Sequence, residues 1–239
     1  MLRFIYLLAF SALCATSTHA QQNNTSPASC PGRTLRVDYD FSGNTHAQHI
    51  AVAGLSSFSG WAGRRVHTDS VPLRGNGDIT LRDLHTGRVL YCQSFSTLFQ
   101  EWLTTEEATH TSRSFENTFL LPMPADSAEV TVRLFNFKHQ VTSSLTHKVA
   151  PDDILIRNLD RTPVPPHRYL HQSGPAADKI DVAIVAEGYT AAQAEAFYAD
   201  AQTAVDAILS HEPFKQYADR FNFVAVAAAS ADSDVSIPK

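Results

Sequence analysis

Between residues 34 and 159 the chain contains short segments in which apolar and polar residues alternate. A period of two is typical of strands that bury one face and expose the other. The clearest segment has its apolar positions at Leu35, Val37, Tyr39 and Phe41. A hairpin turn that ends in glycine is expected over residues 83–87. We therefore predict that residues 34–159 form an all-β sandwich.

The same alternation predicts the other strands of this domain, and one short helical insert is expected among them. The apolar strand positions are Ile50 and Val52, Ile79 and Leu81, Val89 and Tyr91, Phe115, Phe119 and Leu121, Val130, Val132 and Leu134, and residues 145–149. The helix is predicted where four apolar side chains share one face, at Leu98, Phe99, Trp102 and Leu103.

A different pattern occupies the end of the chain. Two apolar runs, over residues 180–186 and 221–229, predict strands that are buried on both faces. Between them, residues 190–212 have apolar positions at helical spacing, and Thr190 and Gln193 match a capping box at the start. This order predicts a parallel strand–helix–strand unit of the α/β class.

A strand–helix–strand unit cannot cover both faces of its own sheet. We therefore expect residues 179–239 to be the truncated start of a larger α/β domain, with an apolar face left open. Residues 160–178 contain Pro163, Pro165, Pro166, Gly174 and Pro175, and they are predicted to form a Pro-rich linker without regular structure. The expected fold is mixed, an all-β sandwich followed by an incomplete α/β domain.

The N-terminus has the features of an export signal. Arg3 supplies the positive charge, residues 4–14 are apolar, and residues 18–20 resemble a cleavage site. Residues 1–20 are thus predicted to be a signal peptide, and residues 21–33 a disordered leader. The apolar run is too short to span a bilayer. We expect an exported protein, periplasmic, cell-surface or extracellular, without an integral membrane span after cleavage.

Charge and cysteine content narrow the possible partners. Removal of Arg3 leaves 18 basic and 24 acidic residues, a net charge of −6, and no basic stripe indicates nucleic-acid binding. Two cysteines follow the predicted cleavage site, Cys30 and Cys92. They can pair in an oxidising compartment, or they can remain free thiols, and the sequence leaves both possibilities open.

Three longer blocks carry a family resemblance. They are Phe99-Gln-Glu-Trp-Leu103 with Ser114-Phe-Glu-Asn-Thr-Phe-Leu-Leu-Pro122, then residues 181–190, and finally Phe223-Val-Ala-Val226 with residues 230–238. From about Arg33 onward the chain resembles the N-terminal half of the bacterial IgA-peptidase family of zinc metallopeptidases. The resemblance implies an N-terminal β-rich domain, a metal-dependent catalytic domain and, for the complete protein, zinc and a protein or peptide substrate.

The zinc motif of that family, His-Glu-x-x-His on a helix, has no counterpart in this chain. The nearest segment, His211-Glu-Pro-Phe-Lys215, lacks the second histidine, and Pro213 would break the helix. We therefore assign no catalytic, cofactor-binding or metal residue, and we expect the chain as given to be inactive and to hold no cofactor. The alternative hypothesis is a non-catalytic, exported β-sandwich that serves in binding or adhesion.

Several polar or aromatic residues are candidates for functional sites, and we expect them to have structural roles instead. His167 and His171 have the spacing of helical metal ligands but lie in the Pro-rich segment. His46 and His49 are expected on the surface. Residues 75–77 form a glycine turn, without the lysine of a phosphate loop.

Four residues complete this set of candidates. Glu187 follows a predicted strand. It either lines the rim of a site or caps the start of the helix, and we favour the cap. Asp232 and Asp234 are interpreted as part of a solvated turn rather than a calcium site. Trp61 is expected in the core rather than in a binding surface.

Overall fold

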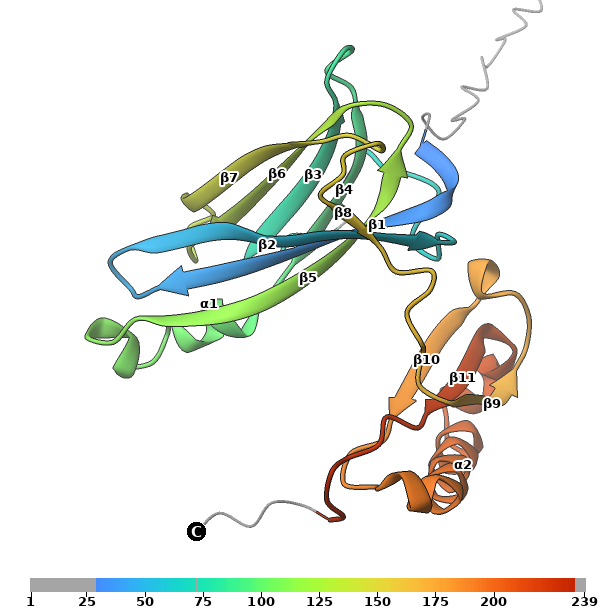
Figure 1. Cartoon of the computed structure of the whole chain (residues 1–239). Helices are drawn as coiled ribbons and strands as arrows, with labels where there is room; N and C mark the ends of the chain where they lie inside the picture. Colours follow the sequence, from blue (N-terminus) through green and yellow to red (C-terminus); the bar gives the residue numbers. More distant parts are fainter. Residues whose placement is uncertain (1–28, 72, 235–239) are drawn as a thin grey trace, which may run out of the picture.

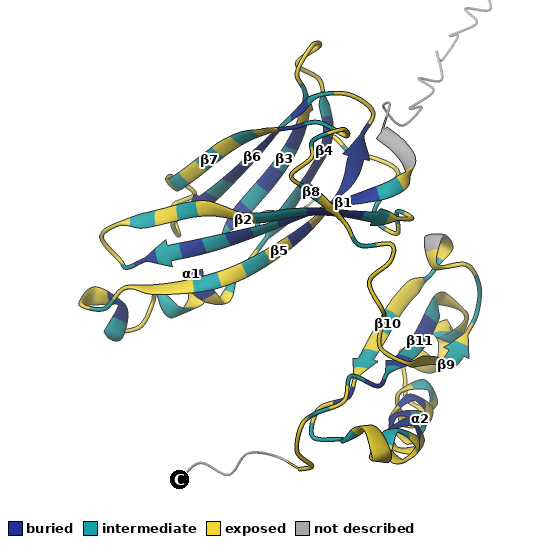
Figure 2. Ribbon diagram, viewed as in Figure 1, coloured by how far each residue is buried: buried dark blue, intermediate teal, exposed yellow. Residues whose placement is uncertain are grey.

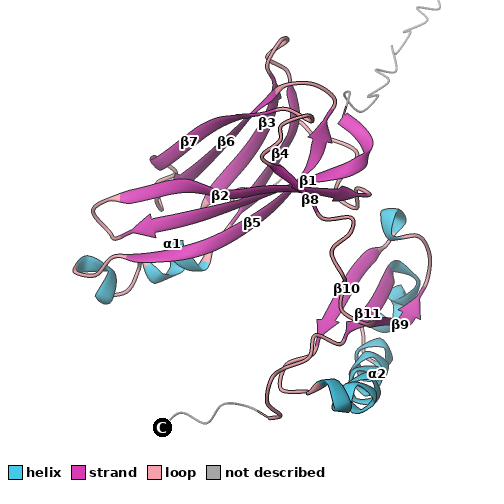
Figure 3. Ribbon diagram, in the orientation of Figure 1, coloured by secondary structure: helices cyan, strands magenta, loops and turns pink. Residues whose placement is uncertain are grey.

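The computed structural model describes residues 29–71 and 73–234, and it contains two groups of strands that follow one another along the chain (Figures 1 and 3). Residues 29–158 form two four-stranded sheets, and residues 167–226 form a smaller sheet with one long helix. The predicted signal peptide, residues 1–20, and residues 21–28 of the predicted leader lie outside the described residues.

The first group has one sheet in the order β5-β1-β2-β8 and another in the order β4-β3-β6-β7. Neighbouring strands are antiparallel except for β2 and β8, which are parallel. The strands are β1 (Ser29–Gly43), β2 (Gln48–Ser59), β3 (Gly77–Asp83), β4 (Val89–Phe95), β5 (Arg113–Pro124), β6 (Ala128–Phe135), β7 (Val141–Val149) and β8 (Ile156–Asn158).

The core of this part lies between the two sheets, as the alternating buried and exposed bands in Figure 2 show. Leu35, Val37, Tyr39 and Phe41 of β1 are fully buried, so the period of two predicted for this strand is confirmed. They belong to one cluster with buried residues from both sheets, including Val132. Burial of apolar side chains from two facing sheets is the main stabilising term of such a domain.

The predicted helical insert is present as α1 (Leu98–Trp102). Its N-cap is Thr97, whose Oγ1 accepts a hydrogen bond from the Gln100 backbone N–H. Phe99 reaches the core, while the Trp102 indole donates to Glu107 over 2.9 Å in the following turn, η1 (Glu107–Thr109). The helix therefore closes one end of the core.

The second group consists of β9 (His167–Gln172), β10 (Ile180–Val185) and β11 (Phe221–Val226) in the order β10-β11-β9. β10 and β11 are parallel and are connected through η3 (Ala191–Gln193), α2 (Ala194–Ser210) and η4 (Phe214–Arg220). Four α2 side chains are buried: Phe197, Tyr198, Ala201 and Val205. The first three pack in one cluster with Ala225 of β11. The predicted parallel strand–helix–strand unit is present.

Buried Asn222 of β11 binds the segment between β9 and β10, which contains η2 (Ala176–Asp178). Its Oδ1 accepts from the Ser173 backbone N–H over 2.8 Å, and its Nδ2 donates to the Gly174 carbonyl over 3.0 Å and to Asp181 over 2.8 Å. A buried amide stabilises a fold only when its polar atoms are paired, as they are here. Asn222 thus holds the three strands in register.

Three predictions need correction. Residues 160–178 are not devoid of regular structure, because residues 167–172, between the first three prolines and Pro175, form β9, an antiparallel edge strand beside β11. The leader was expected to continue to residue 33, but β1 already begins at Ser29. The apolar strand β10 is not buried, since Ile180 and Val185 are 55% and 60% exposed. Its outer edge has no neighbouring strand within the described chain.

Candidate functional site

An open cleft of about 690 Å³ lies where the parallel strands β10 and β11 end. The carboxyl ends of parallel strands are the usual position of sites in open α/β sheets, because the loops there converge from neighbouring strands. The cleft is lined by Glu187, Gly188, Tyr189, Gln193, Ser230, Asp232, Ser233 and Asp234.

Backbone hydrogen bonds tie the loop after β10 to the loop after β11. Gly188 donates its N–H to Ser230 Oγ over 2.9 Å and accepts from the Asp234 N–H over 2.8 Å. Ser230 in turn donates its N–H to the Tyr189 carbonyl over 2.8 Å. Gly188 has a φ of +73°, and a Cβ there would lie 2.9 Å from the Asp234 carbonyl oxygen. Glycine is therefore required at this point of the cleft wall.

The start of the helical segment forms another wall. The Thr190 N–H donates to Gln193 Oε1 over 2.9 Å, which confirms the predicted capping box. Exposed Glu187 lies along the cleft and takes no part in that cap, so the preferred interpretation of Glu187 as a helix-start residue is wrong. The Tyr189 hydroxyl donates to Asp200 over 2.9 Å, and this hydrogen bond raises the pKa of Tyr189.

The cleft has the character of an acidic, solvent-open surface, since three of its side chains are carboxylates. Asp232 and Asp234 are exposed, in agreement with a solvated turn. Within residues 29–71 and 73–234, no group of three or more His, Cys, Asp or Glu side chains is arranged to hold a metal ion. Polar loops at strand ends of this kind can contact a polypeptide.

The histidine pairs are not brought together. His167 and His171 lie on β9 rather than on a helix, where a separation of four residues corresponds to about 13 Å. His171 Nε2 lies 3.0 Å from the Ala218 carbonyl, and His167 Nδ1 lies 3.3 Å from the Pro165 carbonyl. His46 and His49 are exposed around the β1–β2 turn, as expected.

Trp61 packs against the core of the sandwich, as predicted. Its ring is edge-on to Tyr91 at 5.4 Å, and its indole N–H donates to the Arg64 carbonyl over 3.3 Å. Residues 75–77 lead into β3. Cys92 is a buried free thiol on β4, and burial raises its pKa, whereas the side chain of Cys30 lies outside the described residues.

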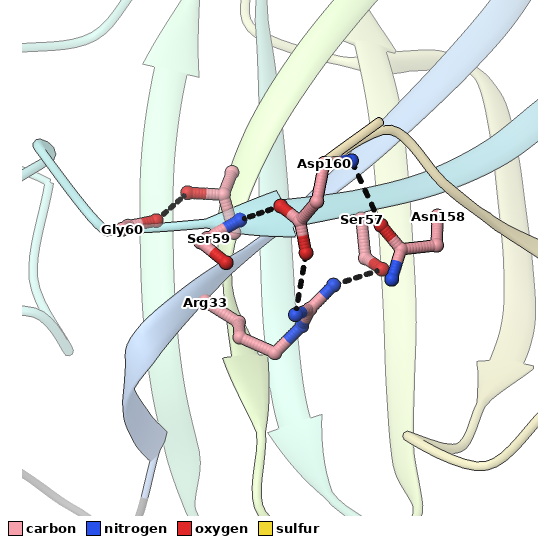
Figure 4. Close-up of polar contacts among 7 residues, drawn as sticks. Arg33, Ser57, Ser59, Gly60, Asn158 and Asp160 are labelled. Atoms are coloured by element: carbon pink, nitrogen blue, oxygen red, sulfur yellow. Dashed lines mark hydrogen bonds and ion pairs between the residues drawn. The ribbon is translucent and has the colours of Figure 1, made fainter. Parts of the chain in front are cut away.

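The point where the chain leaves the sandwich is fixed by an ion pair that the sequence did not indicate (Figure 4). Arg33 on β1 pairs with Asp160 at 3.0 Å and donates to Ser57 Oγ over 2.9 Å. Asp160 also accepts from the Ser59 N–H over 2.6 Å, and this backbone hydrogen bond is the main reason why the pKa of Asp160 is lowered. The start of β1 and the end of β2 therefore hold the first residue of the Pro-rich segment.

Together these features define a protein with a two-sheet N-terminal part and a parallel strand–helix–strand unit that carries an open cleft. Residues 29–146 match the family model described as Peptidase M64 N-terminus, and residues 169–239 match the model described as IgA Peptidase M64. The chain belongs to the M64 family of peptidases, as the sequence blocks predicted. No curated protein sequence matches it.

The first match runs from β1 into β7, and the second begins within β9 and includes β10, α2 and β11. M64 is a metallopeptidase family, and a peptidase implies a protein substrate. None of the helices in the described part of the chain is long and apolar enough to cross a membrane.

Proposed function

We propose that this chain supplies the N-terminal part of an exported zinc metallopeptidase that hydrolyses peptide bonds. The observation that carries the proposal is the parallel β10–α2–β11 unit, which falls inside the IgA Peptidase M64 match and ends in an open cleft. In this proposal the unit begins the catalytic α/β domain, and the sandwich of residues 34–159 precedes it through the segment 160–178.

Uncovered apolar surface on the β10–α2–β11 unit supports this role. Ile180 and Val185 of β10 are more than half exposed, and Phe214 and Tyr217 of η4 are also exposed. Exposed apolar side chains beside an unpaired strand edge mark a surface that another element covers. We infer that further strands of the catalytic sheet add at the free edge of β10 rather than beside β9, because parallel strands extend such a sheet.

The donor set of the described residues does not fit zinc, which needs at least three protein ligands in a catalytic site. The zinc ligands are therefore proposed to lie outside residues 29–71 and 73–234. No step of peptide hydrolysis is assigned to residues of this chain. Their proposed part is structural: they form the start of the sheet and one wall of the cleft.

Metal analysis and peptidase assays on the full product of the gene test this proposal. We expect about one zinc per molecule, hydrolysis of an unfolded protein substrate, and loss of hydrolysis when a chelator removes the metal. The chain of residues 21–239, purified in parallel, should contain no stoichiometric zinc and should cleave nothing. A full gene product without zinc or hydrolysis would contradict the proposed function.

Export is part of the proposal. Cleavage after Ala20 would leave Gln21 at the N-terminus of the mature protein. Mass spectrometry of material secreted by expressing cells tests this point directly. A mature chain that still begins at Met1 would contradict it.

A further inference from the structure

The outward face of the β5-β1-β2-β8 sheet is hollowed by a second open cleft, of about 570 Å³. Its lining comes from all four strands of this sheet and the turn before β8, and it includes Asp38, Gly54, Glu116 and Arg157. The strand β2 is bulged here, because Gly54 pairs with Asp38 whereas Val52 pairs with Tyr39, so that Ala53 is an extra residue. A bulge bends a strand, which accounts for the hollow.

The floor of this cleft consists of a hydrogen-bonded carboxylate, Asp38, beside a glycine, Gly54. Arg36 donates through Nε to both carboxylate oxygens of Asp38 at 2.9 and 3.1 Å, and Thr118 donates to the same carboxylate over 2.6 Å. Gly54 stands beside Asp38, and a Cβ added at Gly54 would meet only Asp38 Oδ2, at 3.9 Å. The floor is thus rigid, and the space above Gly54 is empty.

The two ends of the cleft carry opposite, uncompensated charges. At one end, Glu116 lines the cleft, and its Cα partner on the adjacent strand, Asp40, lies just beyond the lining; both belong to the outward positions of the alternating pattern. Like charges directly opposite destabilise a sheet, yet neither carboxylate has a cationic partner within the described chain. At the other end, Arg157 pairs in register with Ser56 beside Arg36, and its guanidinium likewise has no anionic partner among the described residues.

The spacing of these charges matches an extended polypeptide. Arg36 and Asp40 are four positions apart on β1, which corresponds to about 13 Å along a strand. Arg157 lies level with Arg36 but two strands away, which corresponds to about 10 Å across the sheet. An extended chain lying along β1 has the same rise, and its residues i and i+4 point to the same side. With a basic side chain over Asp40 and Glu116, an acidic side chain four positions away would therefore stand level with Arg157, and the two long side chains would extend toward each other over β2.

We propose that this cleft of the sandwich binds an extended peptide segment of another protein that carries a basic and an acidic side chain four positions apart. Charge complementarity at both ends would select the segment. The aliphatic side chains of Val52 and Leu155 would contact the part of the peptide between its two charged side chains. The proposal goes beyond the proposed peptidase function, because peptide binding by the sandwich requires no catalytic step.

Two fluorescein-labelled peptides of identical composition test the proposal on the chain of residues 21–239. One has Lys and Glu four positions apart, and the other has them three positions apart, which places them on opposite faces of an extended chain. Fluorescence anisotropy at low salt should show at least about tenfold tighter binding of the first peptide, and added salt should reduce the difference.

Three variants should remove the preference: Glu116→Lys and Arg157→Glu reverse one charge each, and Gly54→Gln fills the floor. Matched charge reversals away from the cleft, Glu101→Lys on α1 and Lys138→Glu in the β6–β7 turn, should retain it. Arg157→Glu should in addition bind a peptide with Lys at both positions more tightly than the unchanged protein does. Thermal unfolding checks that each variant is folded. If Gly54→Gln does not fold, Arg157→Glu still tests the proposal, because Arg157 is exposed. Equal binding of the two peptides, or an unchanged preference in Arg157→Glu, would overturn the proposal.

Discussion

The hydroxyl oxygen of Tyr39 on β1 lies 2.7 Å from Nε2 of His147 on β7, so this hydrogen bond connects the two sheets of the sandwich. The two rings are also in edge contact at 5.7 Å. Tyr39 is fully buried, and burial raises the pKa of its phenol, so the phenol is neutral. The tautomer of His147 decides which of the two groups donates the proton. Burial also lowers the pKa of His147.

This pair makes the stability of the sandwich depend on pH. The unfolded chain binds a proton at His147 near the ordinary histidine pKa of about 6.5, whereas the folded protein resists protonation until a lower pH. The free energy of unfolding should therefore decrease as the pH falls from about 7.5 through 6.5 toward 5. Denaturant unfolding at several pH values measures this decrease.

Substitution of His147 measures how much of the pH dependence of the free energy of unfolding comes from this residue. His147→Gln keeps an acceptor for Tyr39 but cannot titrate, so part of the pH dependence should disappear. His46→Gln, in the exposed β1–β2 turn, is the matched control and should leave the dependence unchanged. If His147→Gln retains the full dependence, the origin assigned to it is wrong.

Adjacent residues of β5 test the assignment of the two sheet faces. Leu121 is fully buried between the sheets, whereas Leu120 is 43% exposed on the outward face. Leu121→Ala should lower the free energy of unfolding by about 2–5 kcal/mol, because it removes buried contacts and leaves a cavity. Leu120→Ala should cost about 1 kcal/mol or less. Equal losses, measured by urea unfolding, would mean that the register of β5 is incorrect.

The Arg33–Asp160 pair should hold the start of the Pro-rich segment against the sandwich. Asp160→Asn removes the ion pair, so the segment around exposed Arg161 should unfold locally more often. Trypsin should then cleave after Arg161 faster by a factor on the order of several-fold. Exchange of the two charges, Arg33→Asp with Asp160→Arg, should restore part of the protection, which Arg33→Asp alone does not. The cleavage rate is followed by mass spectrometry. An unchanged rate in Asp160→Asn would show that the pair does not hold this segment.

Arg168 should stabilise the packing of β9 against α2. Its guanidinium lies 4.1 Å from the centre of the Tyr198 ring and pairs with Glu195 at 2.8 and 3.2 Å. Arg168→Lys keeps the charge but loses the planar, two-pronged contact, so amide exchange in β9 should become faster. Tyr198→Phe keeps the ring and should change exchange little. Hydrogen exchange resolved by mass spectrometry distinguishes the two variants, and equal effects would contradict a stacking role for Arg168.

Local patterns were sufficient to predict several elements. The alternation at Leu35, Val37, Tyr39 and Phe41 predicts β1 because one face of the strand meets the core directly. The cap at Thr190 and Gln193 is encoded within four residues. The family blocks likewise predicted the M64 matches.

Features that depend on distant partners were missed. The segment His167–Gln172 has no apolar alternation, and it becomes a strand only because β11 lies beside it. The ion pair between Arg33 and Asp160 joins residues 127 positions apart. The opposition of Asp40 and Glu116 likewise depends on the register of β1 and β5, which no local pattern specifies.

We propose that β10 begins the catalytic sheet of an M64 peptidase, and hydrogen exchange of Ile180–Val185 tests this proposal. In the chain of residues 21–239, these amides should be weakly protected while those of β1 are strongly protected. In the full product of the gene, the same β10 amides should gain protection as further strands cover the free edge. Protection of β10 as strong as that of β1 in the shorter chain, with no gain in the full product, would contradict the claim and favour a sandwich that acts as a binding module.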